Sequence, residues 1–218
     1  MLINLYRLMR LRIDGILHSI MSLCSLAGAM SASTNIAILA KKGGVGKSAI
    51  SLSLYEALRH AGREVSIHDW DLQGTSTKAL RQIHGSDYKP DHRGKIVIWD
   101  TPPSLDHTAT ATAVRNAQIV LVLTSPALPD TWEAQEAVDF ARSRNAKATL
   151  HLLFNKVRKT TILGRLVEES AKKVTAPTLP VMLSARECYQ HVYALGWKAL
   201  DSDARQEVLQ LAVALLSL

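Results

Sequence analysis

The stretch KKGGVGKS, from Lys41 to Ser48, decides how the rest of this chain is interpreted. It follows a short apolar run and precedes a helical pattern, which is the context that a phosphate-binding loop requires. Its glycines, at positions 43, 44 and 46, let the backbone turn tightly and let its N–H groups approach an anion. We expect Lys47 to reach the β- and γ-phosphates of a nucleotide and the Ser48 hydroxyl to bind Mg²⁺ directly.

Short apolar runs alternate with helical patterns along the chain from Asn35 onward. Near-continuous Val, Ile and Leu are typical of strands that are buried on both faces of a parallel sheet. This alternation predicts an α/β fold, a single domain over residues 35–218 with a mostly parallel central sheet and helices on both faces. Together with the glycine-rich loop, it indicates a fold of the P-loop NTPase type. The predicted strands cover 35–40, 64–69, 95–100, 118–125, 149–155 and 178–184, and the predicted helices cover 47–61, 104–116, 131–144, 161–174, 186–196 and 202–217.

Residues 1–34 form a predicted N-terminal extension whose composition differs from that of the rest of the chain. It has arginines at positions 7, 10 and 12, and residues 16–30 are mostly apolar and carry no charge. This pattern is typical of a secretory signal, whereas a nucleotide-binding loop needs cytosolic ATP. Two other interpretations stay open: translation from Met30, which would make residues 1–29 a gene-start artefact, and a loose amphipathic helix.

The chain of 218 residues is basic, with 26 Lys and Arg against 19 Asp and Glu and a net charge of +7. Residues 1–29 contribute three Arg and one Asp, so that +5 belongs to the part that starts at Met30. A basic surface permits nucleic acid or an anionic membrane as a partner and proves neither. The two cysteines, Cys24 and Cys188, exclude a disulfide framework and a four-cysteine zinc site, and they disfavour an iron–sulfur protein.

Two departures from the common GxxxxGK[ST] pattern distinguish the glycine-rich loop. Lys41 occupies the position of the first glycine, and a second lysine, Lys42, follows it. The string KGGVGKS resembles the deviant Walker A loop of the ParA/MinD ATPases. This resemblance implies that Lys42 crosses a dimer interface and neutralises charge on the transferred phosphoryl group of the partner's nucleotide. The loop residues expected to bind ATP are Lys42, Gly43, Gly44, Val45, Gly46, Lys47 and Ser48.

The segment HDWDLQGTST, residues 68–77, resembles the DxDPQG segment of the same family, with Leu72 in place of the usual proline. By this resemblance Asp71 positions the attacking water and Asp69 supports the magnesium shell. Taken alone, an aspartate in this polar loop is equally well explained as a helix cap. The expected catalytic residues are Lys42, Lys47 and Asp71.

The segment KIVIWDTPPS, residues 95–104, resembles the Walker B strand and switch of the family. A carboxylate at the tip of a strand, here Asp100, can hold Mg²⁺ through its water ligands. The resemblance implies that Thr101 senses the γ-phosphate through its backbone or hydroxyl, and a plain turn at the strand end is the alternative. Asn155 also ends a strand, and in this family an Asn here often hydrogen-bonds adenine, although an Asx turn explains it nearly as well. The expected metal-binding residues are Ser48, Asp69 and Asp100.

The resemblance extends over nearly the whole chain from Asn35 and is greatest to the small ParA proteins, which lack a sequence-specific DNA reader. It implies a cytoplasmic ATPase that forms an ATP-dependent homodimer with Mg²⁺, binds DNA non-specifically and associates with the nucleoid. A ParB-like partner or cargo adaptor would stimulate hydrolysis, and the cargo would be a plasmid, a chromosome or another body. The basic residues considered for DNA contact are Lys156, Arg158, Lys159, Lys172, Lys173, Arg186 and Lys198.

Two alternative functions stay open. A MinD-like membrane switch needs a basic amphipathic tail, but residues 205–218 carry no Lys or Arg after Arg205 and suit a packed terminal helix better. The N-terminal segment would then have to serve as the anchor. An ATP-dependent ligase or synthetase of the same fold would need a second substrate pocket, and the sequence shows no second constellation for one.

Overall fold

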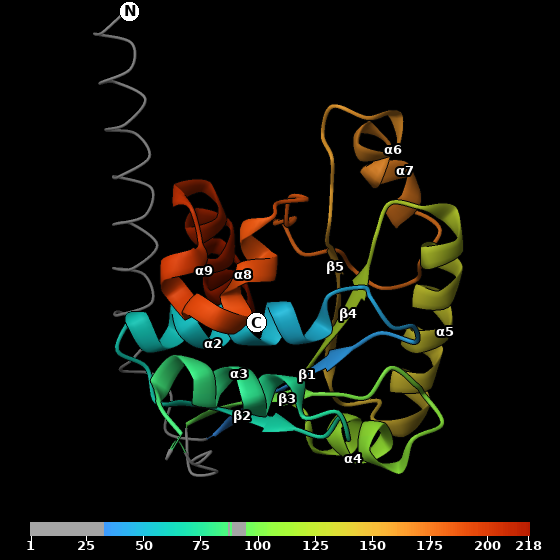
Figure 1. Ribbon diagram of the computed structural model, residues 1–218. Helices are drawn as coiled ribbons and strands as arrows, with labels where there is room; N and C mark the ends of the chain where they lie inside the picture. The colour runs from blue at the N-terminus through green and yellow to red at the C-terminus, as the bar shows by residue number, and fades with distance from the viewer. Residues whose placement is uncertain (1–32, 87, 89–94) are drawn as a thin grey trace, which may run out of the picture.

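A five-stranded parallel sheet forms the centre of the computed structural model, which describes residues 33–86, 88 and 95–218. The strands lie in the order β2–β3–β1–β4–β5 (Figure 1). They cover Thr34–Leu39 (β1), Val65–Asp69 (β2), Ile96–Asp100 (β3), Ile119–Thr124 (β4) and Thr149–Phe154 (β5). The first five predicted strands are confirmed to within one residue at each end, and every pairing between them is parallel.

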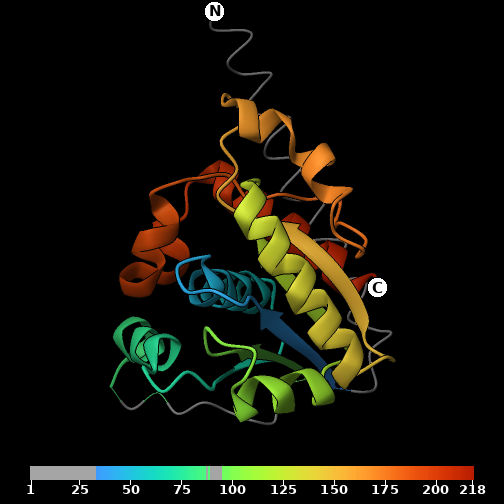
Figure 2. The ribbon, with the colours of Figure 1, turned by 90° about the vertical axis from the view of Figure 1, so that its right-hand side faces the viewer.

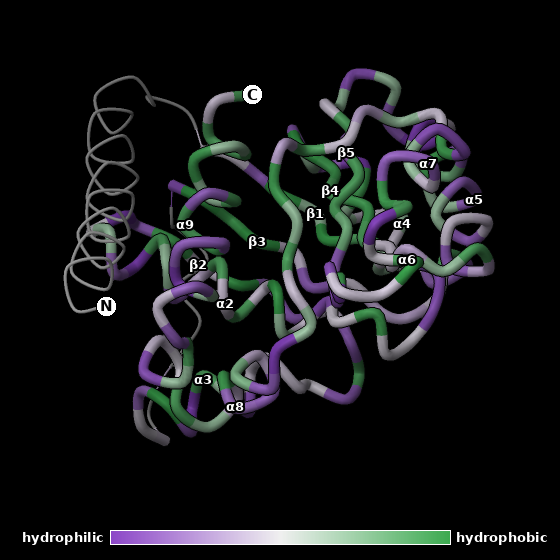
Figure 3. Tube along the Cα trace, turned by 90° about the horizontal axis from the view of Figure 1, so that it is seen from above, coloured by the Kyte–Doolittle hydropathy of each residue, from purple (hydrophilic) through white to green (hydrophobic). Residues whose placement is uncertain are grey.

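Helices cover both faces of this sheet, as the sequence predicts (Figures 1 and 2). Along β1, Ile36 and Ile38 pack on the side of α2, α3, α8 and α9, whereas Ala37 and Leu39 pack on the side of α4 and α5. Both sets of side chains are buried, which explains the uninterrupted apolar runs; Figure 3 shows the strands passing through this hydrophobic centre. The helices are α2 (Lys47–His60), α3 (Thr75–His84), α4 (Thr108–Asn116), α5 (Leu128–Arg144), α6 (Ile162–Arg165), α7 (Val167–Ala171), α8 (Cys188–Leu195), the 3₁₀ helix η2 (Gly196–Ala199) and α9 (Ser202–Leu216).

The predicted sixth strand, residues 178–184, is wrong as a continuous strand. The segment forms bridges only at its two ends, where Thr178 pairs with Leu152 of β5 and Ser184 pairs with Val157, which follows β5. Pro180 lies between these bridges and has no N–H group to donate to a ladder. The segment therefore closes the edge of the sheet without extending it.

The helix predictions need two corrections. The helix predicted over 161–174 is two short helices, α6 and α7, which are separated at Leu166. Glycine at position 164 and an apolar pattern shorter than three turns do not support one long helix. The prediction also omits α3, because this polar segment buries only Ser76, Ala79 and Leu80. An apolar stripe of that length is too short to be recognised from periodicity.

The predictions for the N-terminal extension lie outside the described residues, apart from positions 33 and 34. Thr34 is already the first residue of β1. Within residues 33–86, 88 and 95–218, no helix is long and apolar enough to cross a membrane.

The connections of the sheet determine where a ligand can bind. The chain leaves the central strand β1 toward β2 and β3 on one side, and it later reaches β4 and β5 on the other. In open α/β sheets, a crevice forms at such a switch point, beyond the carboxyl ends of the strands. The glycine-rich loop, both aspartate motifs and Asn155 all follow strand ends at this edge.

Candidate functional site

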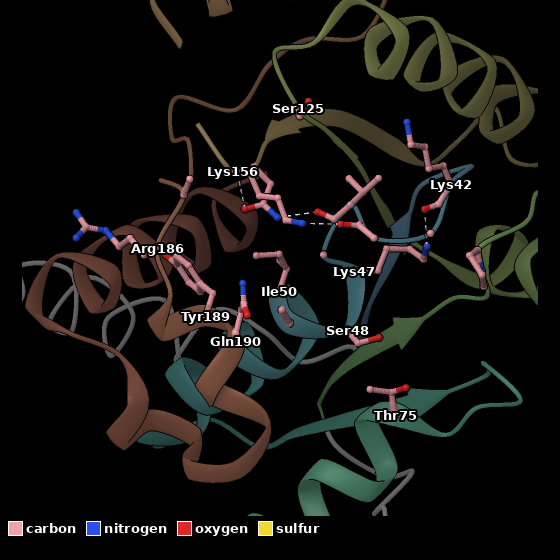
Figure 4. Close-up of a pocket in the computed structure, with 18 of the residues that line it drawn as sticks. Lys42, Lys47, Ser48, Ile50, Thr75, Ser125, Lys156, Arg186, Tyr189 and Gln190 are labelled. Atoms are coloured by element: carbon pink, nitrogen blue, oxygen red, sulfur yellow. Dashed lines mark hydrogen bonds between the residues drawn. The ribbon is translucent and has the colours of Figure 1, made fainter. Parts of the chain in front are cut away.

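The glycine-rich loop connects β1 to α2 and borders a cleft of about 1030 Å³ (Figure 4). Helix α2 begins at Lys47 without a side-chain cap and without an acidic residue in its first turn. Its first N–H groups are therefore left to bind an external acceptor, and the positive end of the helix dipole favours an anion there. The cleft is lined by every predicted loop residue from Lys42 to Ser48, together with Asp71 and Asn155.

Two residues that follow β5 form hydrogen bonds with the backbone of the glycine-rich loop. The Asn155 amide nitrogen donates to the Val45 carbonyl at 2.8 Å, and the Lys156 ammonium donates to the Gly44 carbonyl at 2.6 Å. Lys156 has φ +56°, a left-handed conformation that costs free energy in a residue with a side chain. In Figure 4, Lys156 and Lys42 lie on either side of Lys47. These contacts fix the shape of the loop before any nucleotide binds.

Asn155 thus has a structural role, which differs from the Asx turn that the sequence analysis gave as the alternative. Its side-chain oxygen accepts from the Lys156 N–H at 2.8 Å, so both ends of the amide already contact backbone. One N–H and one lone pair remain, because an amide carries two donors and two acceptor sites. A contact between Asn155 and adenine stays a prediction.

Gly46 provides a direct test of this loop geometry. It has φ +105°, and a Cβ atom there would lie 2.6 Å from the Asn155 amide nitrogen. We expect Gly46→Ala to lower the free energy of unfolding by about 2–3 kcal/mol, because it adds a lost hydrogen bond to backbone strain. Gly44→Ala is the matched control, since Gly44 has φ +77° but open space around its Cβ position. Its expected cost is about 1–2 kcal/mol, from strain alone.

Urea unfolding of both variants measures this difference. Replacing Asn155 by Ala in the Gly46→Ala background removes the clash, so the two changes are expected to cost less together than the sum of their separate costs. Equal stabilities of the Gly46→Ala and Gly44→Ala chains would contradict the proposed contact with Asn155.

Lys47 lies at the bottom of the cleft and is 7% exposed. Its ammonium donates to the Lys42 carbonyl at 3.4 Å. Burial lowers the pKa of Lys47, an effect that the negative charges of Asp100 and Asp71 partly offset. A buried cation with one long hydrogen bond is a suitable binding partner for a phosphate oxygen.

Asp100 ends β3 beneath the loop and is 1% exposed. One of its carboxylate oxygens accepts from the Ser76 hydroxyl at 2.5 Å, and the other is buried without a hydrogen-bond partner among the described residues. Burial raises the pKa of Asp100 to about 6, although hydrogen bonds from Ser76 and Ser48 lower it. A free buried carboxylate oxygen beside a serine hydroxyl is the donor set that Mg²⁺ and its water ligands prefer. Asp100 and Ser48 therefore fit the predicted metal site.

Asp69 and Asp71 both hold the loop between β2 and α3. Asp69 accepts from the Asp71 N–H at 3.2 Å and from the Thr77 N–H at 2.8 Å. It therefore caps α3, whose own N-cap position is Gly74, and it does not line the cleft. Asp71 does line the cleft, and one of its oxygens accepts from the Gln73 N–H at 3.0 Å. The catalytic and metal roles of these two residues stay predictions.

Thr101, which follows β3 in the switch segment, has a hydroxyl group that already makes a hydrogen bond. It is buried, and it donates to the Ile38 carbonyl at 2.6 Å. This hydrogen bond joins the end of β3 to β1, so a γ-phosphate contact through the hydroxyl would require it to break.

The sequence analysis missed the contacts of the two lysines that begin the loop. The Lys42 ammonium lies 2.7 Å from Asp130 and 3.8 Å from Glu133, and Lys41 lies 2.5 Å from Glu136. All three carboxylates belong to α5 of the same chain. Their spacing of three residues is visible in the sequence, but nothing local indicates that this helix face meets the loop.

The basic residues considered for DNA contact divide into two groups. Lys156 contacts the glycine-rich loop, Lys172 pairs with Glu169 at 2.8 Å, and Arg186 pairs with Asp203 at 3.1 Å and with Asp201 at 3.4 Å. These ion pairs leave little of the Arg186 charge for a phosphate. Among the described residues, no such side-chain contact is found for Arg158, Lys159, Lys173 and Lys198, which are all exposed.

The arrangement of sheet, loop and carboxylates defines a class of protein. A central parallel strand leads through a glycine-rich loop into a helix, with a buried lysine and a buried aspartate beside it. This is the fold and site of a P-loop NTPase.

Sequence comparison finds similarity to one family over part of the chain. Residues 31–127 match the ParA family model, described as NUBPL iron-transfer P-loop NTPase. Maintenance of carboxysome distribution protein A of Halothiobacillus neapolitanus is 25% identical over 193 residues, which cover 78% of this chain and 88% of that protein. A cytosolic Fe-S cluster assembly factor Nubp2 homolog of Drosophila willistoni is 50% identical over 64 residues, which cover 29% of this chain and only 24% of that protein. Residues 31–127, a little under half of the chain, thus resemble the P-loop NTPase domain of the ParA family.

Solved structures share this fold. The MinD cell division protein of Aquifex aeolicus has a TM-score of 0.69 at 17% identity, over 85% of this chain and 98% of that one. A putative plasmid partition protein of Borrelia burgdorferi bound to AMPPNP has a TM-score of 0.66 at 17% identity, over 85% and 100% of the two chains. Cobyrinic acid a,c-diamide synthase of Mycobacterium smegmatis, with a bound ATP analog and magnesium, has a TM-score of 0.66 at 20% identity, over 84% and 94%.

Proposed function

We propose that this protein is a magnesium-dependent ATPase. The observation that carries the proposal is the cleft itself, which brings together the uncapped start of α2, the buried Lys47 and Asp71. Asp100, with one free carboxylate oxygen, lies beside Ser48 and Lys47 of this cleft. Water attacks the γ-phosphorus of ATP, the bond to the bridging oxygen breaks, and ADP and phosphate leave. Asp71 orients the water, and Lys47 neutralises charge on the phosphates. Ser48 and Asp100 would hold Mg²⁺, which when bound would supply further charge neutralisation.

The same proposal includes an ATP-dependent homodimer in which Lys42 reaches the partner's phosphates. Lys42 sits at the rim of the cleft with nearly half of its side chain exposed, so its ammonium can leave its present partners without disturbing the core. The protein would act in the cytoplasm as a switch that positions a cargo, with a partner protein stimulating hydrolysis. The likeness to a carboxysome-distribution protein and to a partition protein supports a positioning role.

We further propose that the ATP-bound dimer binds DNA without reading its sequence. Arg158 and Lys159 follow β5 on the side of the cleft, and both side chains are exposed. The net charge of +7 favours phosphate contacts, whose strength falls steeply with salt. The ATP-bound dimer would therefore associate with the nucleoid.

A salt-titrated binding assay on random-sequence duplex DNA tests this part of the proposal. The AMPPNP-loaded chain is expected to bind, and the double variant Arg158→Glu and Lys159→Glu to bind at least tenfold more weakly. Its slope of log affinity against log salt is expected to fall by about 2, because each phosphate contact contributes about 0.9. Lys95→Glu is the matched control, because Lys95 lies at the opposite end of the sheet, 3.9 Å from Glu64. Salt-insensitive binding, or equal losses in both variants, would contradict the DNA surface.

One observation favours an anionic membrane as a second candidate surface. Ile162 and Leu163 of α6 and Leu166, which follows α6, are 78%, 51% and 44% exposed, and basic residues at positions 158, 159 and 165 flank them. Apolar side chains among cations suit a lipid interface better than a DNA backbone. Vesicles containing an anionic lipid, added to the same assay, distinguish the two surfaces.

A further inference from the structure

Three carboxylates of α5 form an acidic stripe, Asp130, Glu133 and Glu136, that faces the start of the glycine-rich loop. Residues three apart lie on the same face of a helix, so the stripe runs along α5 for about two turns. Its first two members contact Lys42, and its last member contacts Lys41. The two consecutive lysines therefore have separate partners within their own chain.

Asp130 is held in place from the other side. Its second carboxylate oxygen accepts from the Ser125 hydroxyl at 2.5 Å, in the turn between β4 and α5. Only 19% of the Asp130 side chain is exposed, against 47% of the Lys42 side chain. The carboxylate is thus the fixed partner of the pair and the ammonium is the mobile one. The hydrogen bond from Lys42 also lowers the pKa of Asp130, although burial opposes this, so the aspartate is charged at neutral pH.

We propose that Asp130 and Glu133 form an intramolecular latch that holds Lys42 and sets the nucleotide concentration at which the chain dimerises. The inference rests on the proposed function, in which Lys42 serves the phosphates of a second copy. One ammonium cannot contact these carboxylates and a partner's nucleotide together. Dimerisation must therefore break the pair with Asp130, and the free energy of that pair opposes the dimer. The triphosphate provides the competing negative charge that releases Lys42.

Neutral replacements of the carboxylates test the latch. We expect the double variant Asp130→Asn and Glu133→Gln to dimerise at a roughly two- to fivefold lower AMPPNP concentration than the wild-type chain, the range typical of exposed ion pairs. Sedimentation velocity at a fixed protein concentration measures the midpoint, and the non-hydrolysable nucleotide prevents turnover. Glu133→Gln alone is expected to give a smaller shift and provides a second variant if Asp130→Asn loosens the start of α5.

Glu136→Gln is the matched control. It removes a carboxylate from the same helix face, but its partner is Lys41, which does not line the cleft. Its dimerisation midpoint is expected to equal that of the wild-type chain. A Lys42→Ala change, added to the double variant, is expected to abolish dimerisation and so to show that the carboxylates act through Lys42.

A measurement on the nucleotide-free chain separates failure of the latch from failure of the proposed dimer. Acetylation of single lysines, followed by mass spectrometry, is expected to be several-fold faster at Lys42 in the double variant, and faster at Lys41 in Glu136→Gln. Unchanged acetylation of Lys42 overturns the latch. Faster acetylation with a wild-type chain that stays monomeric in AMPPNP overturns the proposed dimer and with it the regulatory role. A dimerising wild-type chain whose midpoint stays the same, or rises, in the double variant overturns the latch alone.

Discussion

A Lys47→Ala chain is expected to lose ATP binding by about two orders of magnitude, because a hydrogen bond to a charged group is worth about 1.5–3 kcal/mol and the phosphates engage it more than once. Lys47 is the one predicted loop residue whose charged group lies buried at the bottom of the cleft, near both Asp100 and Asp71. In the variant, the negative charge of the phosphates would face the carboxylates of Asp100 and Asp71 without the cation between them. Isothermal titration with ATP and Mg²⁺ measures the loss.

The fold is expected to survive this change. Burial lowers the pKa of Lys47, so keeping its ammonium protonated at neutral pH already costs folding free energy, and the alanine removes that cost. Lys41→Ala is the matched control, since Lys41 is the exposed lysine that precedes the loop and pairs with Glu136. It is expected to bind ATP as the wild-type chain does. Undiminished affinity in Lys47→Ala would remove this residue from the phosphate site.

The part of the site that the sequence predicts well is the part that depends on short stretches of chain. The glycine-rich loop needs only its own residues and the strand and helix beside it, and it lies where the sequence places it. Each strand end is likewise marked locally, by Asp69, Asp100 and Asn155. Parallel strands then bring these ends to one edge, because the direction of every strand is the same.

The contacts that the sequence could not predict join distant segments. Lys42 and Asp130 are 88 residues apart, and Asn155 and Val45 are 110 residues apart. Neither periodicity nor spacing in the sequence can predict such a contact, because the contact depends on how far α5 and β5 extend past the loop. The same reasoning applies to Asp69, whose second partner, the Thr77 N–H, belongs to a helix that the apolar pattern did not reveal.

The capping role of Asp69 also gives a new interpretation of its pairing with Asp71 in the sequence. Both oxygens of Asp69 accept backbone N–H groups, so its first effect is to hold the segment that carries Asp71. Asp71 then presents its side chain to the cleft from a turn that is fixed at both ends. The spacing of two residues between these carboxylates thus has a structural reason that is independent of any metal.

An Asp71→Ala chain is expected to bind ATP and to dimerise, but to hydrolyse ATP about 10²–10⁴-fold more slowly, the usual loss when a positioned acid or base is removed. Asp71 uses one oxygen for the Gln73 N–H, and within residues 33–86, 88 and 95–218 the other is available for a water molecule beside the γ-phosphate. The residues of the glycine-rich loop that are proposed to bind the phosphates do not include Asp71, so its loss should leave ATP binding intact. Phosphate release, measured alongside the mass of the ATP-bound species in solution, separates turnover from binding.

Asp71→Asn separates a catalytic role of the Asp71 carboxylate from its structural role in the turn that ends at Gln73. The amide oxygen can still accept from the Gln73 N–H, so the local backbone is retained while the negative charge is lost. We expect Asp71→Asn to be nearly as slow as Asp71→Ala, and the exposed Asp106→Ala, outside the cleft, to turn over normally. A fast Asp71→Asn chain beside a slow Asp71→Ala chain would assign Asp71 to the turn, and two fast chains would remove it from the reaction. Because Asp71 lines the cleft and one of its oxygens is engaged only by the Gln73 N–H, a slow pair would make it the group that orients the attacking water.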